Sequence, residues 1–138
     1  MKAILITRKG GPEVLELREV PTPVAGRGEV LIKVKAAGLN RSDIYSRTSD
    51  KYGEQSGMEI PGLEVSGTIA ACGAGSTRYK EGDAVCALVT GGGYAEYIAV
   101  PEGQCLPVPE GSDLEAAAAV EKNVWPLVTR GKVLLRVS

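Results

Sequence analysis

The chain of 138 residues contains no histidine and no phenylalanine, and it has a single tryptophan. The absence of histidine excludes Ser-His-Asp and Cys-His nucleophilic catalysis, histidine general bases and histidine metal ligands. Without phenylalanine, a hydrophobic core has to be built mainly from valine, leucine, isoleucine and alanine. Eighteen glycines and eight prolines indicate many turns.

Cysteine is also scarce. The three cysteines, Cys72, Cys86 and Cys105, lie 14 and 19 positions apart and form no C-x-x-C pair. An odd number without close spacing argues against a disulfide framework and against a zinc lobe. We therefore expect small apolar thiols in the core of a protein from a reducing compartment.

The chain lacks a charge excess and a long hydrophobic run. Lys and Arg total 16 and Asp and Glu total 17, for a formal net charge of -1, so nucleic acid and membrane surfaces are poor candidate partners. No segment approaches the ~18 apolar residues that span a bilayer. Residues 1–8 have too short an apolar core for a secretory signal. We expect a first β-strand there and a cytoplasmic protein.

Turn signals recur about every ten residues over the first two thirds of the chain, which is typical of an all-β barrel or sandwich. Glycine or proline clusters separate the segments of alternating hydrophobicity. The fold class that this pattern predicts is mainly β with short helices. The expected strands are 1–8, 13–20, 29–37, 63–71, 83–90, 94–100, 104–108 and 132–137.

Two short helices are expected. Residues 40–47 form the first, capped by Asn40 or Ser42, with Asp43 in its first turn where the helix dipole favours negative charge. The second is an alanine-rich helix over 112–119, where Ser112 and Glu115 have the spacing of a capping box.

Three polar or glycine-rich features have a structural and a functional interpretation. Asn40, Asp43 and Arg47 share one helix face, which indicates either a capped helix with one surface ion pair or part of a site. Glu64 is either a charge at a strand edge or a buried carboxylate. Residues 91–93 are three glycines without the strand, G-x-G-x-x-G and helix context of a phosphate loop, so a turn is expected.

Five motifs follow one another along the chain. They are EVLIKV at 29–34, GLNRSD at 38–43, PGLEVSG at 61–67, GDAV at 82–85 and GGYAEY at 92–97. In this order they resemble the medium-chain dehydrogenase/reductase superfamily, and in detail the zinc-free, NADPH-dependent quinone oxidoreductases of the zeta-crystallin-like branch. The resemblance implies a GroES-like, partly open β-barrel over residues 1–120, the catalytic domain of such enzymes.

The resemblance also implies that zinc is absent. Zinc alcohol dehydrogenases hold their catalytic zinc with a cysteine where this chain has Asn40 and with a histidine where it has Leu63. Amide and alkyl side chains cannot replace thiolate and imidazole at zinc. The structural zinc lobe of those enzymes has no counterpart in this sequence, so we expect no metal site.

The resemblance assigns candidate site residues. It implies that Asn40 lies near the nicotinamide of NADPH, with Asp43 as its companion on the helix. Tyr52 would lie in the quinone cleft, able to stack or donate a hydrogen bond, and Tyr45 is a second candidate there. The family usually has a glycine shortly before this tyrosine, where this chain has residues 48–51 without one.

A quinone oxidoreductase also needs a Rossmann domain to hold the NADPH phosphates. The family enters this domain after the segment that matches residues 114–120, but here that segment is followed directly by residue 121 without such a domain. Residues 121–129 resemble a late helix of the family and 130–137 its terminal strand. We therefore expect residues 121–138 to complete the same domain, with the nucleotide-binding insert missing. Tight NADPH binding by the chain alone is not expected.

Two functions of different classes follow. The first is the substrate-side domain of an NADPH:quinone oxidoreductase, inactive or weakly active alone. The alternative is a non-catalytic barrel or interaction module that self-associates through surfaces exposed by the missing domain. A co-chaperonin ring subunit would share only the fold, and the motifs at 40–43 and 61–67 argue against it.

Overall fold

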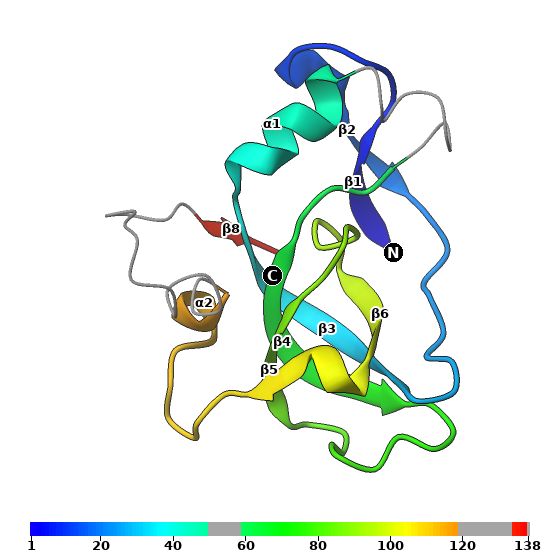
Figure 1. Cartoon of the computed structure of the whole chain (residues 1–138), viewed down its shortest axis with the longest axis vertical. Helices are drawn as coiled ribbons and strands as arrows, with labels where there is room; N and C mark the ends of the chain where they lie inside the picture. Colours follow the sequence, from blue (N-terminus) through cyan, green and yellow to red (C-terminus); the bar gives the residue numbers. More distant parts are fainter. Residues whose placement is uncertain (50–58, 119–133, 138) are drawn as a thin grey trace.

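The computed structural model describes residues 1–49, 59–118 and 134–137, and these form a mainly β fold with short helices (Figure 1). The helix predicted over 121–129 lies outside the described residues. No helix within the described residues is long and apolar enough to cross a membrane. The strands are β1 (Lys2–Ile6), β2 (Leu15–Glu19), β3 (Glu29–Gly38), β4 (Glu64–Cys72), β5 (Ala84–Leu88), β6 (Tyr97–Pro101), β7 (Cys105–Pro107) and β8 (Leu134–Arg136). The helices are α1 (Arg41–Thr48) and α2 (Leu114–Ala117), with 3-10 turns η1 (Pro12–Val14) and η2 (Glu102–Gln104).

The ten-residue strand β3 is the centre of the main sheet, whose strand order is β6-β3-β4-β5-β7. One edge of β3 pairs with β4, and the other pairs first with β6 and then with β8. The alternation predicted in this segment places Val30, Ile32 and Val34 in the core, each at most 1% exposed. Because both edges of β3 are paired, its far end is held firmly where the chain turns into α1.

β3 and β4 approach each other closely at Gly67. The pairing register shifts between Val34 and Ala36, opposite Gly67 and Ser66. A Cβ atom on Gly67 would lie 2.1 Å from the carbonyl oxygen of Lys33, which is far inside van der Waals contact. Glycine is therefore required at this point of the sheet.

β1 and β2 form a separate two-stranded sheet that is attached to the barrel through β1. The backbone N–H of Ile4 donates to the carbonyl of Tyr94 at 2.8 Å, and that of Ile6 donates to the carbonyl of Glu59 at 2.8 Å. The alternation over 13–20 predicts a half-buried strand, but this is wrong on the leucine face of β2, since Leu15 and Leu17 are 37% and 66% exposed. Among the described strands, β2 pairs with β1 alone.

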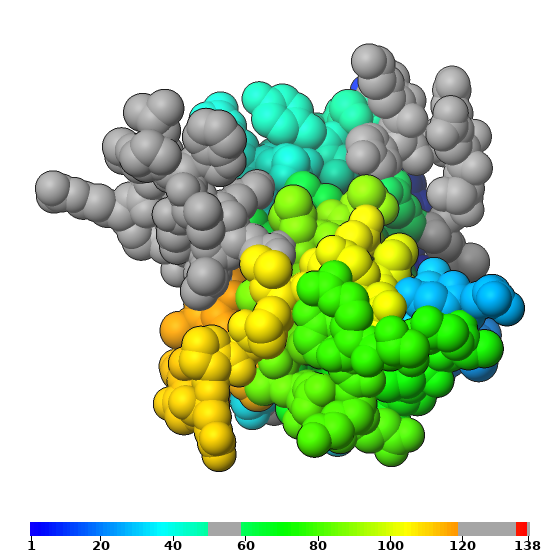
Figure 2. Space-filling view, turned by 60° about the horizontal axis from the view of Figure 1, so that its bottom comes forward, coloured from blue at the N-terminus to red at the C-terminus, as the bar shows by residue number. Residues whose placement is uncertain are grey.

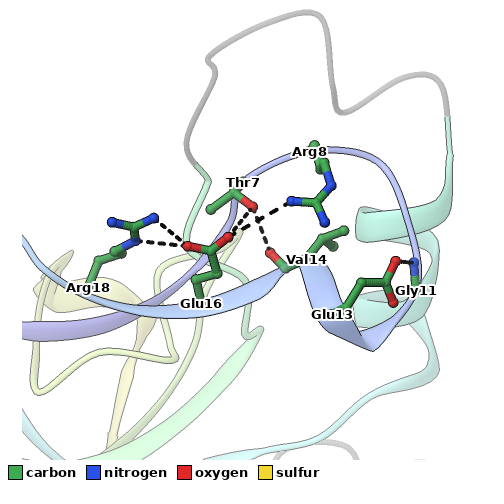
Figure 3. Close-up of polar contacts among 7 residues, drawn as sticks. All are labelled: Thr7, Arg8, Gly11, Glu13, Val14, Glu16 and Arg18. Carbon is green, nitrogen blue, oxygen red and sulfur yellow. Dashed lines mark hydrogen bonds and ion pairs between the residues drawn. The ribbon is translucent and has the colours of Figure 1, made fainter.

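Charged side chains hold this hairpin together on its outer side (Figure 3). The Glu16 carboxylate accepts hydrogen bonds from Arg18 Nε at 3.0 Å and from Thr7 Oγ1 at 3.1 Å, and it lies 4.0 Å from Arg8 Nη1. The hydrogen bonds from Arg18 and then Thr7 lower the pKa of Glu16. These polar contacts therefore tie β2 to the residues that follow β1.

Glu102 of η2 fastens the loop between β4 and β5. In Figure 2 the green and yellow segments lie against each other. One oxygen, Oε2, accepts from Ser76 Oγ at 2.7 Å and from the backbone N–H groups of Thr77 and Arg78 at 3.0 Å. The hydrogen bond from the Arg78 backbone, followed by that from Ser76, lowers the pKa of Glu102. The carboxylate thus holds in place a loop that contains no helix or strand.

Other local predictions are confirmed or corrected. α2 begins after Asp113, whose side chain accepts a hydrogen bond from the Glu115 N–H at 2.9 Å, so the cap is Asp113 and not Ser112. Cys86 and Cys105 are buried thiols as expected, whereas Cys72 is exposed. It lies at the end of β4, beyond the covered part of the sheet.

We expect Gly67→Ala to lower the free energy of unfolding by about 3 kcal/mol or more, because the new methyl group collides with the Lys33 carbonyl and pushes β3 and β4 apart. Urea unfolding followed by circular dichroism measures this. Gly103→Ala is the matched control, since a Cβ there meets nothing within 4 Å. Equal midpoints for the two variants would contradict the prediction.

We expect Glu102→Gln to destabilise the protein at about pH 7 but not at about pH 3. A carboxylate whose pKa is lowered in the folded state contributes stability above its ordinary pKa, and this contribution is lost as the pH falls through the lowered value. Thermal unfolding at both pH values tests this. The exposed Glu110→Gln variant is the control, and a pH-independent difference for Glu102→Gln would argue against the assigned cause.

Candidate functional site

The candidate site lies where β3 ends and α1 begins. Asn40 is the N-cap of α1, with extended backbone angles, as one of the two predicted alternatives has it. The Asn40 backbone N–H donates to Asp43 Oδ2 at 2.7 Å, and the Asp43 N–H donates to the Asn40 carbonyl oxygen at 3.0 Å. This reciprocal pairing satisfies backbone groups that a helix start leaves open, and it places a carboxylate at the positive end of the helix.

Tyr94, from the turn before β6, joins this helix start. Its hydroxyl donates to the same Asp43 Oδ2 at 2.6 Å, so one carboxylate oxygen accepts both bonds. Tyr94 is 5% exposed. Burial, followed by the hydrogen bond and charge of Asp43, raises the pKa of Tyr94 far above its ordinary value. The phenol is therefore a neutral donor at any physiological pH.

The side chain of Asn40 is half-buried beside this pair. Its Nδ2 donates to the Gly38 carbonyl oxygen at 3.3 Å, which directs the amide back along the end of β3. A primary amide both donates and accepts hydrogen bonds. Asn40 is thus the predicted site residue whose chemistry suits a polar ligand group.

The other predicted residues are placed differently. Tyr45, on α1, is 59% exposed and is therefore available to a ligand, whereas Tyr52 lies outside the described residues. Arg47 Nη1 donates to the Gly10 carbonyl at 2.9 Å. Among the described residues no ion pair joins Asp43 and Arg47, so the predicted surface ion pair is wrong, whereas the predicted cap at Asn40 is confirmed.

Glu64 is a buried carboxylate at the first position of β4, with 1% of its surface exposed. It pairs with Leu88 of β5, between two neighbouring strands of the sheet. The alternative of a charge at a strand edge is therefore excluded. The neighbouring Leu63, whose carbonyl accepts from the Val89 N–H at 2.8 Å, is half-buried.

Glycines allow Tyr94 to reach the site. Gly62 has φ +102, and a Cβ on it would lie 2.6 Å from Tyr94 Cδ1. Gly91 and Gly92 also have positive φ, at 142 and 89, and the backbone bends at Gly91 without a regular turn over 91–93. The Pro61 carbonyl accepts the Tyr94 N–H at 2.9 Å across this junction.

Tyr94 was not predicted as part of the site. Tyr94 was expected only as one position of an alternating strand, and it stands 51 positions from Asp43. No local periodicity relates two residues so far apart. A tyrosine after three glycines is a weak signal that a polar group is carried into the interior by a turn.

Comparison with known proteins places this geometry in a family. Residues 26–110 match the model of the alcohol dehydrogenase GroES-like domain. A quinone oxidoreductase from Lama guanicoe is 38% identical over 122 residues, which cover 87% of this chain and 37% of the relative. The chain therefore spans little more than a third of the length of the curated relatives that it matches.

Solved structures agree with the sequence relatives. The human synaptic vesicle membrane protein VAT-1 homolog-like protein superposes with a TM-score of 0.84 at 32% identity, over 89% of this chain and 40% of that protein. A quinone oxidoreductase from Thermus thermophilus, solved also in complex with NADPH, gives a TM-score of 0.70 at 41% identity, over 88% of this chain and 37% of the other.

We expect Tyr94→Phe to change how stability depends on alkaline pH. An acid whose pKa is raised in the folded state contributes stability that is full below its unfolded pKa of about 10 and is lost as the pH rises further. The wild type should therefore lose about 1.4 kcal/mol more than Tyr94→Phe between about pH 9 and about pH 11. Urea unfolding at both pH values tests this, with Tyr97→Phe as the control. Parallel losses in wild type and Tyr94→Phe would contradict the prediction.

Proposed function

The chain belongs to the family of alcohol dehydrogenase GroES-like domains, and we propose that it acts as the substrate-side domain of an NADPH-dependent quinone oxidoreductase. It is homologous to the catalytic domain of quinone oxidoreductases. The observation that carries the proposal is the half-buried Asn40 amide at the start of α1, whose Nδ2 donates to the Gly38 carbonyl and whose backbone N–H donates to Asp43. The 38% sequence identity to a quinone oxidoreductase over 87% of the chain supports the same assignment.

Asn40 fits the nicotinamide end of NADPH. Its amide offers one donor group and one acceptor oxygen, which match the carboxamide that NADPH carries on its nicotinamide ring. When bound, NADPH supplies the hydride that reduces the quinone. The 138 residues contain no G-x-G-x-x-G turn, so we assign to them only the nicotinamide side and not the phosphates.

Asp43 has a supporting part. Its Oδ2 already accepts two hydrogen bonds, from the Asn40 N–H and the Tyr94 hydroxyl. An oxygen committed in this way orients its neighbours and is poorly suited to take a proton from a substrate. We assign to Asp43 the role of orienting Asn40. Hydride transfer needs this because its rate depends on how precisely the nicotinamide and the quinone are positioned.

The quinone would lie against aromatic side chains. Tyr45 is exposed on α1, and aromatic rings stack on flat conjugated molecules. We propose that Tyr45 and Tyr52 border the quinone, with a phenol donating to a quinone oxygen. Zinc takes no part, because Asn40 and Leu63 stand where zinc relatives use thiolate and imidazole.

The first test is a fluorescence titration of the 138-residue chain with NADPH, followed by turnover with 1,4-benzoquinone. We expect weak or undetectable binding and little turnover, because the contacts that hold phosphates are not part of this sequence. Saturable, tight binding would contradict the division of the cofactor site. Light scattering on the same sample tests the alternative of a self-associating barrel, which requires a mass that rises with concentration.

The decisive test is a chimera in which residues 1–118 replace the matching segment of the Thermus thermophilus quinone oxidoreductase. We expect NADPH-dependent quinone reduction, and we expect Asn40→Ala to lower kcat/KM by about 100-fold. Exposed Gln104→Ala is the control. A folded chimera that binds NADPH but does not reduce quinones would overturn the proposed function.

A further inference from the structure

Among the described residues, α1 is fastened by polar contacts at its two ends. None of its eight residues is buried. At its C-terminal end, Arg47 donates through Nη1 to the Gly10 carbonyl at 2.9 Å, and its own carbonyl accepts the Gly10 N–H at 2.8 Å. At its N-terminal end, the described contact from outside the β3–α1 segment is the hydrogen bond from Tyr94 to Asp43.

Tyr94 is itself fixed from several sides. Its N–H donates to the Pro61 carbonyl at 2.9 Å, and its carbonyl accepts from the Ile4 N–H at 2.8 Å. Its ring packs against Gly62, where no side chain could be accommodated. The phenol therefore approaches the helix from a rigid support that includes β1 and the loop before β4.

The same phenol controls the surroundings of Asn40. Asp43 Oδ2, which accepts the Tyr94 hydroxyl, also accepts the Asn40 N–H. The Gly38 carbonyl oxygen, which accepts Asn40 Nδ2 at 3.3 Å, lies 3.5 Å from the Tyr94 hydroxyl. The backbone and the side chain of Asn40 thus each contact a group that Tyr94 also contacts.

We propose that Tyr94 is a positioning residue, whose buried hydroxyl sets the orientation of Asn40 through Asp43. The proposal rests on the proposed function for its catalytic consequence, since Asn40 is the assigned contact of the nicotinamide. Loss of the hydroxyl leaves Asp43 with one hydrogen bond fewer and leaves the start of α1 without this outside contact. Asn40 then samples orientations that do not suit hydride transfer.

The first experiment uses NMR on the full 138-residue chain and needs no activity. We expect Tyr94→Phe to speed hydrogen exchange of the Asn40 backbone amide about 10-fold relative to the Ile32 amide of β3, and to shift the Asn40 side-chain amide resonances. Tyr79→Phe is the matched control. Tyr79 also donates a hydrogen bond, to the Cys105 carbonyl at 2.7 Å, but from the loop between β4 and β5, at the other end of the molecule from α1 (Figure 1). Equal effects of the two variants at Asn40 would overturn the proposal.

If Tyr94→Phe does not fold, NMR on the wild-type protein tests the proposed role of Tyr94 instead. The Tyr94 hydroxyl proton, buried and bonded to Asp43, should exchange slowly enough to give its own resonance, with a cross-peak to the Asn40 amide proton. A hydroxyl proton that exchanges as fast as those of exposed tyrosines would overturn the proposal.

The second experiment measures quinone reduction by the chimera. We expect Tyr94→Phe to lower kcat about 10-fold with KM for the quinone within twofold, and Tyr79→Phe to leave both unchanged. In an Asp43→Asn background, Tyr94→Phe should not lower kcat further, because the acceptor is already altered.

An inactive wild-type chimera would count against the proposed function, while the NMR experiment still tests the positioning role of Tyr94. An active chimera with equal kcat for both tyrosine variants would overturn the positioning role.

Discussion

The pairing of β3 along both of its edges is the constraint on which the rest of the structure depends. β4 lies on one edge, and β6 and β8 share the other. The apolar side of the strand fills the core with branched side chains, and phenylalanine is not needed for that purpose. Because the strand is held over its whole length, the residues that follow Gly38 start from a fixed point.

The two helices depend on this sheet in different ways. α2 lies against it, with Ala117 buried and the Leu114 carbonyl accepting a hydrogen bond from buried Ser66. α1 projects from the end of β3 with no buried residue. Because none of its residues is fully buried, α1 keeps part of its surface accessible, which suits a surface that binds a ligand.

Much of the fold could be predicted from the sequence, because strands in this chain alternate and glycines mark their ends. The helix start at Asn40 and Asp43 was also predictable, since a cap is a local pattern of a few residues. The hydrogen bond from Tyr94 to Asp43 was not, because it depends on how two turns meet in space. The exposure of Leu15 and Leu17 was missed for a related reason: alternation identifies the two faces of a strand but not whether a second layer covers them.

The end of the main sheet at β7 has a consequence for the behaviour of the chain in a crowded solution. Sheet edges invite further strands, which is a common route to aggregation. β7 is only three residues long and its last residue is Pro107, which has no backbone N–H to offer. A second chain that added itself at this edge would find too few donors for a stable ladder, so the short strand disfavours fibre growth from this edge of the sheet.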